Sequence, residues 1–343
     1  MSLFAKEPNF DFIGKRWYAV ALSAALITAG VVVMVLNGGL RFGIDFSGGS
    51  LMVLEFAQPT SEAAVRDALT LIDEKDVQQY GDSGGGVLVR LPQADPEEGT
   101  RLEEGAERVL SLLNESSLGE FEEVSRELVG PVIGAELQQR GVSAFLFAMV
   151  GILGYIAFRF SYSFGVGAIV AVAHDILVTF SLLTLFGYEL SLNVVAAMLT
   201  ITGYSVNDSI VVFDRVRENT RRRGRGDFPA LVNTSVNQTL ARTIITSGTT
   251  AFTVLALFVF GGEVLRGFAF TMFVGVVTGT YSTIFIAAPV AILITQWRVA
   301  RRGLPASDAT SPRRPQVTAT PSSDAPTRPT RPQAKRRGRN VRV

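Results

Sequence analysis

Hydrophobic residues occur along this chain in long runs with almost no charge, and six of these runs have the length of a membrane-spanning helix. They cover residues 17–36, 141–158, 164–186, 190–213, 243–262 and 267–297. A helix that crosses a bilayer needs about 20 apolar residues, with a range of roughly 17–25. The last run is long enough to tilt or to emerge from the bilayer. The pattern therefore predicts a polytopic α-helical membrane protein with six transmembrane helices.

A different pattern fills the segment between the first two runs, residues 37–141. Short apolar stretches predict strands at 44–56, 77–80, 87–91 and 120–128, with a glycine-rich turn at 81–86. Amphipathic stretches predict helices at 61–72, capped by Thr60 or Ser61, and at 96–114. The order β-α-β-β-α-β is that of a ferredoxin-like unit. We expect a small α+β domain here.

Lysine and arginine are distributed unevenly, and this predicts the orientation of the helices. The segment 37–141 carries 20 acidic and 8 basic residues, whereas the residues from 297 onward carry 2 acidic and 12 basic residues. The loop 214–237 contains six arginines against three acidic residues. Because basic residues favour the cytoplasmic side, we expect both termini, the Arg159 turn and this loop inside, and the acidic domain outside.

These boundaries predict five parts. Residues 1–16 form a cytoplasmic N-terminus, 17–36 the first transmembrane helix, 37–141 the extracytoplasmic domain, 142–297 a five-helix region with the basic loop 214–237, and 298–343 a disordered basic cytoplasmic tail. The first run is too long for a typical cleaved signal peptide, which favours an uncleaved anchor. The tail is rich in Pro, Ser, Thr and Arg. It is either a solvated segment or one that contacts anionic lipid or ribosomal RNA.

Composition excludes several kinds of chemistry. The chain has no cysteine, so disulfides and thiol chemistry are excluded. Its single histidine, His174, excludes metal sites built from several histidines. We expect no cofactor, no metal and no enzymatic activity.

The fourth run contains an aspartate, Asp208, within an otherwise apolar stretch. A charge near the bilayer centre costs roughly 2.5–3.5 kcal/mol on insertion scales, so such residues are usually functional. Small and polar residues recur around it at steps of three and four, which predicts one face turned toward neighbouring helices: Asn193, Ala196, Ala197, Thr200, Gly203, Tyr204, Asn207 and Asp208.

The fifth run supplies a candidate partner for this aspartate. Arg242 lies shortly after the basic loop, and Asp208 lies about 10 Å before Arg215 along its own helix. The two side chains are therefore predicted at comparable depth, where an ion pair is geometrically plausible. It is either a static brace between helices or a switch in which moving the arginine loads or releases a proton.

Two further features of the runs admit two interpretations each. The pair His174-Asp175 in the third run is either a proton relay or a hydrogen-bonded contact between helices. Gly275 and Gly279 have GxxxG spacing, which favours packing over mechanism.

Several motifs together resemble the SecF family of protein-export membrane proteins, over about residues 8–298. They are Gly43-Ile44-Asp45-Phe46-Ser47-Gly48-Gly49, Val129-Gly130-Pro131-Val132-Ile133-Gly134, Ala173-His174-Asp175, the stretch 203–217, Thr239-Leu240-Ala241-Arg242-Thr243, Ser247-Gly248-Thr249-Thr250 and Phe260-Gly261-Gly262. The resemblance implies half of a resistance-nodulation-division-type bundle of six helices, with an outer domain after the first.

The resemblance also implies a function. We expect an accessory subunit of the Sec translocase in the bacterial cytoplasmic (inner) membrane. With its partner SecD and the SecYEG channel, it would use the proton-motive force to assist the translocating preprotein. The predicted proton pathway comprises Asp208, Arg242, His174, Asp175 and Asn207. The alternatives are half of a proton-driven exporter of small molecules or lipids, and a passive structural subunit.

Overall fold

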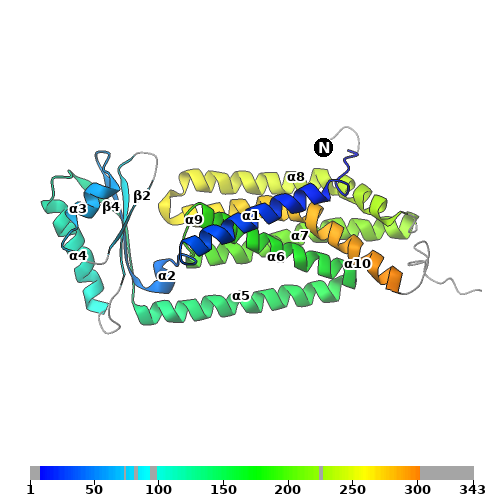
Figure 1. Ribbon diagram of the computed structural model, residues 1–343, viewed down its shortest axis with the longest axis horizontal. Helices are drawn as coiled ribbons and strands as arrows, with labels where there is room; N and C mark the ends of the chain where they lie inside the picture. Colours follow the sequence, from blue (N-terminus) through cyan, green and yellow to red (C-terminus); the bar gives the residue numbers. More distant parts are fainter. Residues whose placement is uncertain (1–7, 73–74, 81–83, 93–98, 224–226, 302–343) are drawn as a thin grey trace, which may run out of the picture.

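The structure, a computed structural model, describes residues 8–72, 75–80, 84–92, 99–223 and 227–301. Long helices run side by side, and a small α+β domain lies beyond one end of them (Figure 1). The first and last described helices, α1 and α10, both reach toward the end of the bundle farthest from this outer domain (Figure 1). The predicted tail 298–343 lies outside the described residues beyond Arg301.

Among the described residues, six helical segments are long and apolar enough to cross a membrane, as predicted. They are α1 (Arg16–Leu36), α5 (Pro131–Arg159), α6 (Tyr162–Leu185), α7 (Leu192–Arg223), α8 (Phe228–Phe260) and a last span built from α9 (Gly262–Ser282), the π-helix η1 (Thr283–Ala287) and α10 (Ala288–Arg301).

The predicted loop 214–237 is mostly helix, which corrects the sequence-based expectation. Helix α7 continues to Arg223, and α8 already begins at Phe228. Glu218 bridges Arg215 at 2.6 Å and Arg222 at 2.8 Å, at the spacings that stabilise exposed helix. With 32 residues, α7 is about 48 Å long, which exceeds the roughly 30 Å of the bilayer core. The two helices therefore continue beyond the apolar region that hydropathy detects.

The last span contains a π-helical turn. A proline inside a helix has no N–H to donate, and its ring collides with the carbonyl group four residues earlier. Pro289 places that clash at Phe285, which lies within η1. The wider π-helical turn is the local response to this proline.

The outer domain is a four-stranded antiparallel sheet with two helices on one face. Its elements are α2 (Ile44–Ser47), β1 (Gly49–Phe56), α3 (Glu62–Ala68), β2 (Asp76–Tyr80), β3 (Gly86–Leu91), α4 (Gly99–Glu115) and β4 (Phe121–Val129). The strand order β2-β3-β1-β4 is that of the predicted ferredoxin-like domain. Helices α3 and α4 cover the face turned away from the bundle (Figure 1).

Details of this domain refine the expectation. Residues 44–47 form the short helix α2 instead of the start of a strand. Of the predicted turn 81–86, residues 81–83 lie outside the described part, as do residues 96–98 of the predicted second helix. Ser61 caps α3, because its hydroxyl accepts a hydrogen bond from the Ala64 amide at 3.3 Å.

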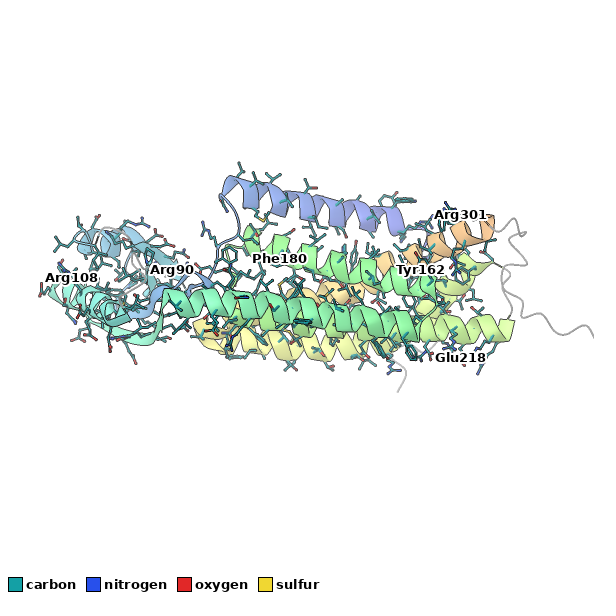
Figure 2. All side chains as sticks on the ribbon, turned by 90° about the horizontal axis from the view of Figure 1, so that it is seen from below. Arg90, Arg108, Tyr162, Phe180, Glu218 and Arg301 are labelled. Atoms are coloured by element: carbon teal, nitrogen blue, oxygen red, sulfur yellow. The ribbon has the colours of Figure 1, made fainter. Side chains whose placement is uncertain are left out.

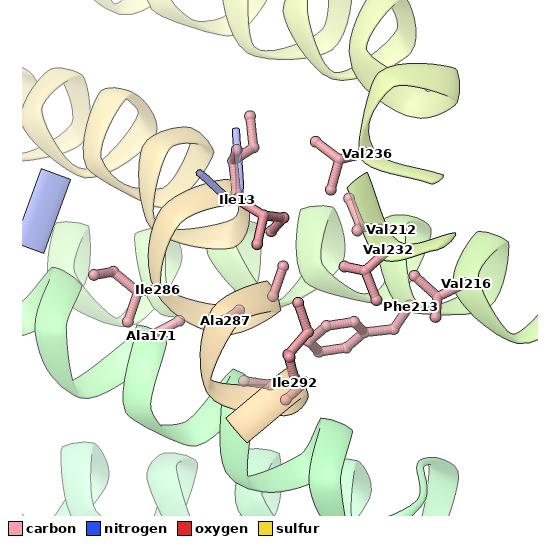
Figure 3. Packing of buried hydrophobic residues seen from close by; sticks show 14 of the residues in the cluster. Ile13, Ala171, Val212, Phe213, Val216, Val232, Val236, Ile286, Ala287 and Ile292 are labelled. Atoms are coloured by element: carbon pink, nitrogen blue, oxygen red, sulfur yellow. The ribbon is translucent and has the colours of Figure 1, made fainter. Parts of the chain in front are cut away.

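A hydrophobic cluster holds the bundle together at the end away from the outer domain. Phe213 and Val216 of α7 pack there with Val232 of α8 and with Ile292 of α10 (Figure 3). Ile13, which precedes α1, joins the same cluster. The N-terminal segment is held in place by two asparagines of α8, since both side chains bond to its backbone: Asn233 and Asn237.

Glycines allow α9 to approach α7 closely. A Cβ atom added at Gly275 would lie 2.4 Å from Ile201 Cδ1, and one at Gly279 would lie 3.0 Å from Ser205 Cβ. The GxxxG pair is therefore a packing feature.

We predict that Gly275→Ala destabilises the bundle by about 1–3 kcal/mol, the usual cost of overpacking. A matched control is Gly154→Ala on α5, where an added Cβ meets nothing within 4 Å. Unfolding of the two variants in lipid nanodiscs checks this. Equal stability of the two variants would contradict the packing role.

Candidate functional site

Asp208 lies on α7 with only 4% of its surface exposed. Ser247 of α8 donates a hydrogen bond to its Oδ2 atom at 3.4 Å. The Ser247 hydroxyl in turn accepts from Thr280 of α9 at 2.7 Å and from Tyr204 at 3.4 Å. The carboxyl group thus lies where α7, α8 and α9 meet, and it accepts a hydrogen bond from Ser247, which two further hydroxyl groups contact in turn.

Arg242 lies on α8, the helix adjacent to Asp208, but does not form an ion pair with it in the described part of the chain. Its side chain is exposed, as is that of Asn207 on α7. The pairing of Asp208 with Arg242 therefore stays a prediction.

The predicted polar face of α7 is divided between two environments. Ala197 and Asp208 are buried against neighbouring helices of the chain. The other small or polar positions form an uncovered stripe along α7: Asn193, Ala196, Thr200, Gly203 and Asn207. Exposed positions of α8 include Arg242 and Thr249. This chain by itself covers only part of the predicted face.

His174 and Asp175 form a second buried cluster, on α6. Both side chains are buried, with exposed fractions of 8% and 3%. Nδ1 of His174 lies 3.0 Å from Oδ1 of Asp175, and Nε2 lies 2.8 Å from the hydroxyl group of Ser23 on α1. The structure therefore brings His174 and Asp175 together in a hydrogen-bonded pair, and His174 also contacts the hydroxyl group of Ser23.

The other oxygen of Asp175 accepts two hydroxyl groups. Ser205 of α7 donates to Oδ2 at 2.5 Å, and Ser282 of α9 donates at 2.8 Å. Tyr281 of α9 lies 3.1 Å from Ser23 and donates to the Ala19 carbonyl group of α1. One cluster of polar groups thus joins α1, α6, α7 and α9.

Four consecutive residues before and at the π-helical turn take part in these contacts. Thr280 reaches Ser247 of the Asp208 cluster, and Tyr281 and Ser282 reach the His174–Asp175 cluster. Thr283, the first residue of η1, lies 3.0 Å from Ser209, which follows Asp208. The segment 280–283 therefore connects the two buried carboxyl groups.

Sequence reasoning did not identify the hydroxyl groups that surround these carboxyl groups. Serine and threonine are common in membrane helices, where many bond only to their own backbone. Ser205 differs because it lies three residues from Asp208 on the same helix, yet bonds to Asp175 of another helix. Only the packing of α6 against α7 reveals this.

Together, six bilayer-length helices, an outer α+β domain and two buried carboxyl groups define a polytopic membrane protein with ionisable groups inside its bundle. Comparison with known proteins identifies the type. Residues 109–297 match the family described as protein export membrane protein SecD/SecF, C-terminal, and residues 33–60 match the SecD/SecF GG motif. The chain belongs to the SecD/SecF family.

Its relatives support this assignment. The chain is 43% identical over 296 residues to the protein translocase subunit SecF of Desulfurispirillum indicum, an alignment that covers 84% of this chain and 91% of the relative. Identity to the SecF subunit of Escherichia coli O157:H7 is 40% over 285 residues, covering 82% and 87%.

A solved structure shows the same fold. The structure of SecDF, a translocon-associated membrane protein from Thermus thermophilus, matches with a TM-score of 0.74 and 37% identity. The match covers 86% of this chain and 40% of that longer chain. The fold is therefore half of a resistance-nodulation-division-type bundle with one outer domain, as predicted.

We predict that Ser205→Ala destabilises the bundle by about 1.5–3 kcal/mol, because a hydrogen bond to a carboxylate is lost. Thr200→Ala is the control, since its exposed hydroxyl group bonds only to the Ala196 carbonyl of its own helix. Chemical unfolding in nanodiscs measures both. A loss for Ser205→Ala no larger than for the control would refute a stabilising role for the Asp175 cluster.

Proposed function

We propose that this chain, together with SecD, uses the proton-motive force to assist protein translocation through the SecYEG channel. Asp208 is the proton carrier in this proposal. The observation that carries it is the position of Asp208, which is buried within a membrane-spanning helix and hydrogen-bonded to Ser247. A carboxyl group in such surroundings, with no ion pair in the described part of the chain, can exist in a neutral form as well as a charged one.

Arg242 is the proposed partner that alternates with the proton. It lies on the helix that also supplies Ser247, and its side chain is left uncovered by the described part of this chain. An arginine that approaches the carboxylate favours the charged form, and one that withdraws favours proton uptake. Asn207 lies beside Asp208 on the uncovered side of α7 and would line the same path.

SecD is the proposed cover for this uncovered side. Small and polar residues in membrane helices usually face other helices, because close packing and hydrogen bonds between helices favour this arrangement. The exposed stripe of α7 and the exposed Arg242 and Thr249 of α8 have this character. The match of this chain to 40% of a solved SecDF chain is consistent with a second half that lies against it.

His174 and Asp175 are proposed as the second part of the pathway. Their cluster reaches α7 at Ser205, which lies three residues before Asp208, and reaches α9 at Ser282. A histidine between a carboxylate and a hydroxyl group has the arrangement that a proton relay requires.

We further propose the bacterial cytoplasmic (inner) membrane as the location, with both termini in the cytoplasm. Arginines gather at the end of the bundle away from the outer domain, on the extension of α7 and on α10. Aromatic residues near this end suit a bilayer interface: Trp17, Tyr18, Tyr162 and Trp297. Tyr162 and Arg301 mark this end in Figure 2. The basic tail would contact anionic lipid.

We predict that Asp208→Asn abolishes the part of preprotein translocation that depends on the proton gradient, because an amide cannot carry the proton. The measurement is translocation into membrane vesicles with and without an uncoupler. Asp214→Asn on the same helix is the control, since its exposed carboxyl group lies beyond the apolar part of α7.

Co-purification with SecD separates the outcomes. Loss of coupling with intact assembly supports the proton carrier. Normal coupling of Asp208→Asn would refute it, and loss of both coupling and assembly would favour a passive structural subunit.

A further inference from the structure

Residues 41–49 link α1 to the outer domain. They also form hydrogen bonds with the turn between α6 and α7 and with the first residue of α7. Leu190, in the turn between α6 and α7, donates its amide to the Arg41 carbonyl group at 2.8 Å. Its own carbonyl group accepts from Gly43 at 2.8 Å. Residues 41–43 therefore lie alongside the α6–α7 turn like a short strand.

Asp45 extends this contact to α7 itself. Its Oδ2 atom accepts the backbone N–H of Leu192, the first residue of α7, at 2.8 Å. The helix already has a local cap, because the Ser191 hydroxyl group accepts the Val194 amide at 3.2 Å. The helix therefore does not depend on Asp45 to begin, and the consequence of this bond is to attach α7 to the start of the outer domain.

Two glycines turn the chain from this attachment into the sheet. Gly48 and Gly49 have φ angles of 71° and 121°, which side-chain-bearing residues rarely adopt. A Cβ at Gly49 would also lie 2.4 Å from the Leu91 carbonyl oxygen. Strand β1 therefore starts at Gly49, four residues after Asp45 and directly after the turn that follows α2.

Arg90 makes a second contact between the sheet and the same turn. From β3 it forms an ion pair with Glu189, and it donates to the Phe42 carbonyl group at 3.2 Å. Figure 2 shows Arg90 on the side of the outer domain nearest the bundle. The two charged side chains are mostly buried, with 14% and 23% exposed. Burial lowers the pKa of Arg90, but an arginine stays protonated.

A second carboxyl group of the outer domain senses Asp45. Burial, followed by repulsion from Asp45, raises the pKa of the Glu127 carboxyl group on β4.

We infer that Asp45 and Arg90 are positioning residues that fasten the outer domain to the N-terminal end of α7, the helix that carries Asp208. The inference rests on the proposed function of Asp208. Leu192 and Asp208 are about 24 Å apart along one continuous helix. A displacement of α7 at the proton site is thereby passed through Leu192, Asp45 and the Leu190 contact to β1, and through Glu189 and Arg90 to β3.

The absence of cysteine in the chain allows direct measurement of this coupling. Spin labels at Ser111→Cys on α4 and Val35→Cys at the end of α1 occupy exposed positions on the outer domain and on the bundle. The chain is reconstituted in nanodiscs with a cysteine-free SecD, and pulsed electron paramagnetic resonance gives the distance distribution between the labels. Asp208→Asn mimics the protonated aspartate.

We expect Asp45→Ala to broaden the distance distribution and to remove most of the shift that Asp208→Asn causes. Asp45→Asn retains an oxygen that accepts the Leu192 amide, so it should preserve both the width and the shift. Arg90→Gln should broaden the distribution as Asp45→Ala does. Asp67→Ala, on an exposed position of α3, is the control for loss of a carboxylate from the outer domain.

An unchanged width in Asp45→Ala would overturn the attachment. A broader distribution with a full Asp208→Asn shift would overturn the coupling. If Asp208→Asn causes no shift in the parent chain, the coupling is overturned, while the proposed function is decided separately by the translocation assay of Asp208→Asn and the width still tests the attachment.

Discussion

A carboxyl group inside a bundle of apolar helices must find hydrogen-bonding partners in the protein, because an unsatisfied polar group there is costly. Asp175 meets this requirement with groups from three helices, accepting from Ser205 and Ser282 while it pairs with His174. Since the histidine also reaches Ser23, α1 is joined to the same cluster. Hydrogen bonds centred on this one buried acid therefore join α1, α6, α7 and α9.

The π-helical turn η1 directly follows the residues of α9 that bond to Ser247 and Asp175. Pro289 forces a departure from regular helix at η1. Just before it, Ser282 donates to Asp175, and Thr280 donates to Ser247, the hydrogen-bond partner of Asp208. Single π-helical turns inside α-helices are frequent at functional sites. Helix α9 therefore contacts the surroundings of both buried acids.

Much of the fold was predictable, because hydropathy and strand alternation are local properties. The six spans and the order of the outer domain follow from them. The ends of α7 and α8 were not predictable in this way, since Arg215, Glu218 and Arg222 interrupt the apolar run yet form helix through their ion pairs. The hydroxyl groups around Asp175 could not be predicted because their partners are distant in sequence. Whether Arg242 is exposed could not be predicted either, because it depends on how the helices pack around α8.

The sequence by itself determined that the chain crosses a membrane, that it carries an outer domain and that Asp208, His174 and Asp175 lie within its apolar spans. These conclusions depend on the free-energy cost of placing charges in hydrocarbon. Each residue contributes to this cost according to its own side chain, so the sequence is enough to estimate it. The tertiary structure decided which groups meet those charges, and that Asp45 bonds to the first residue of α7. Hydrogen bonds act over about 3 Å, so only the packing of distant segments determines which of them form.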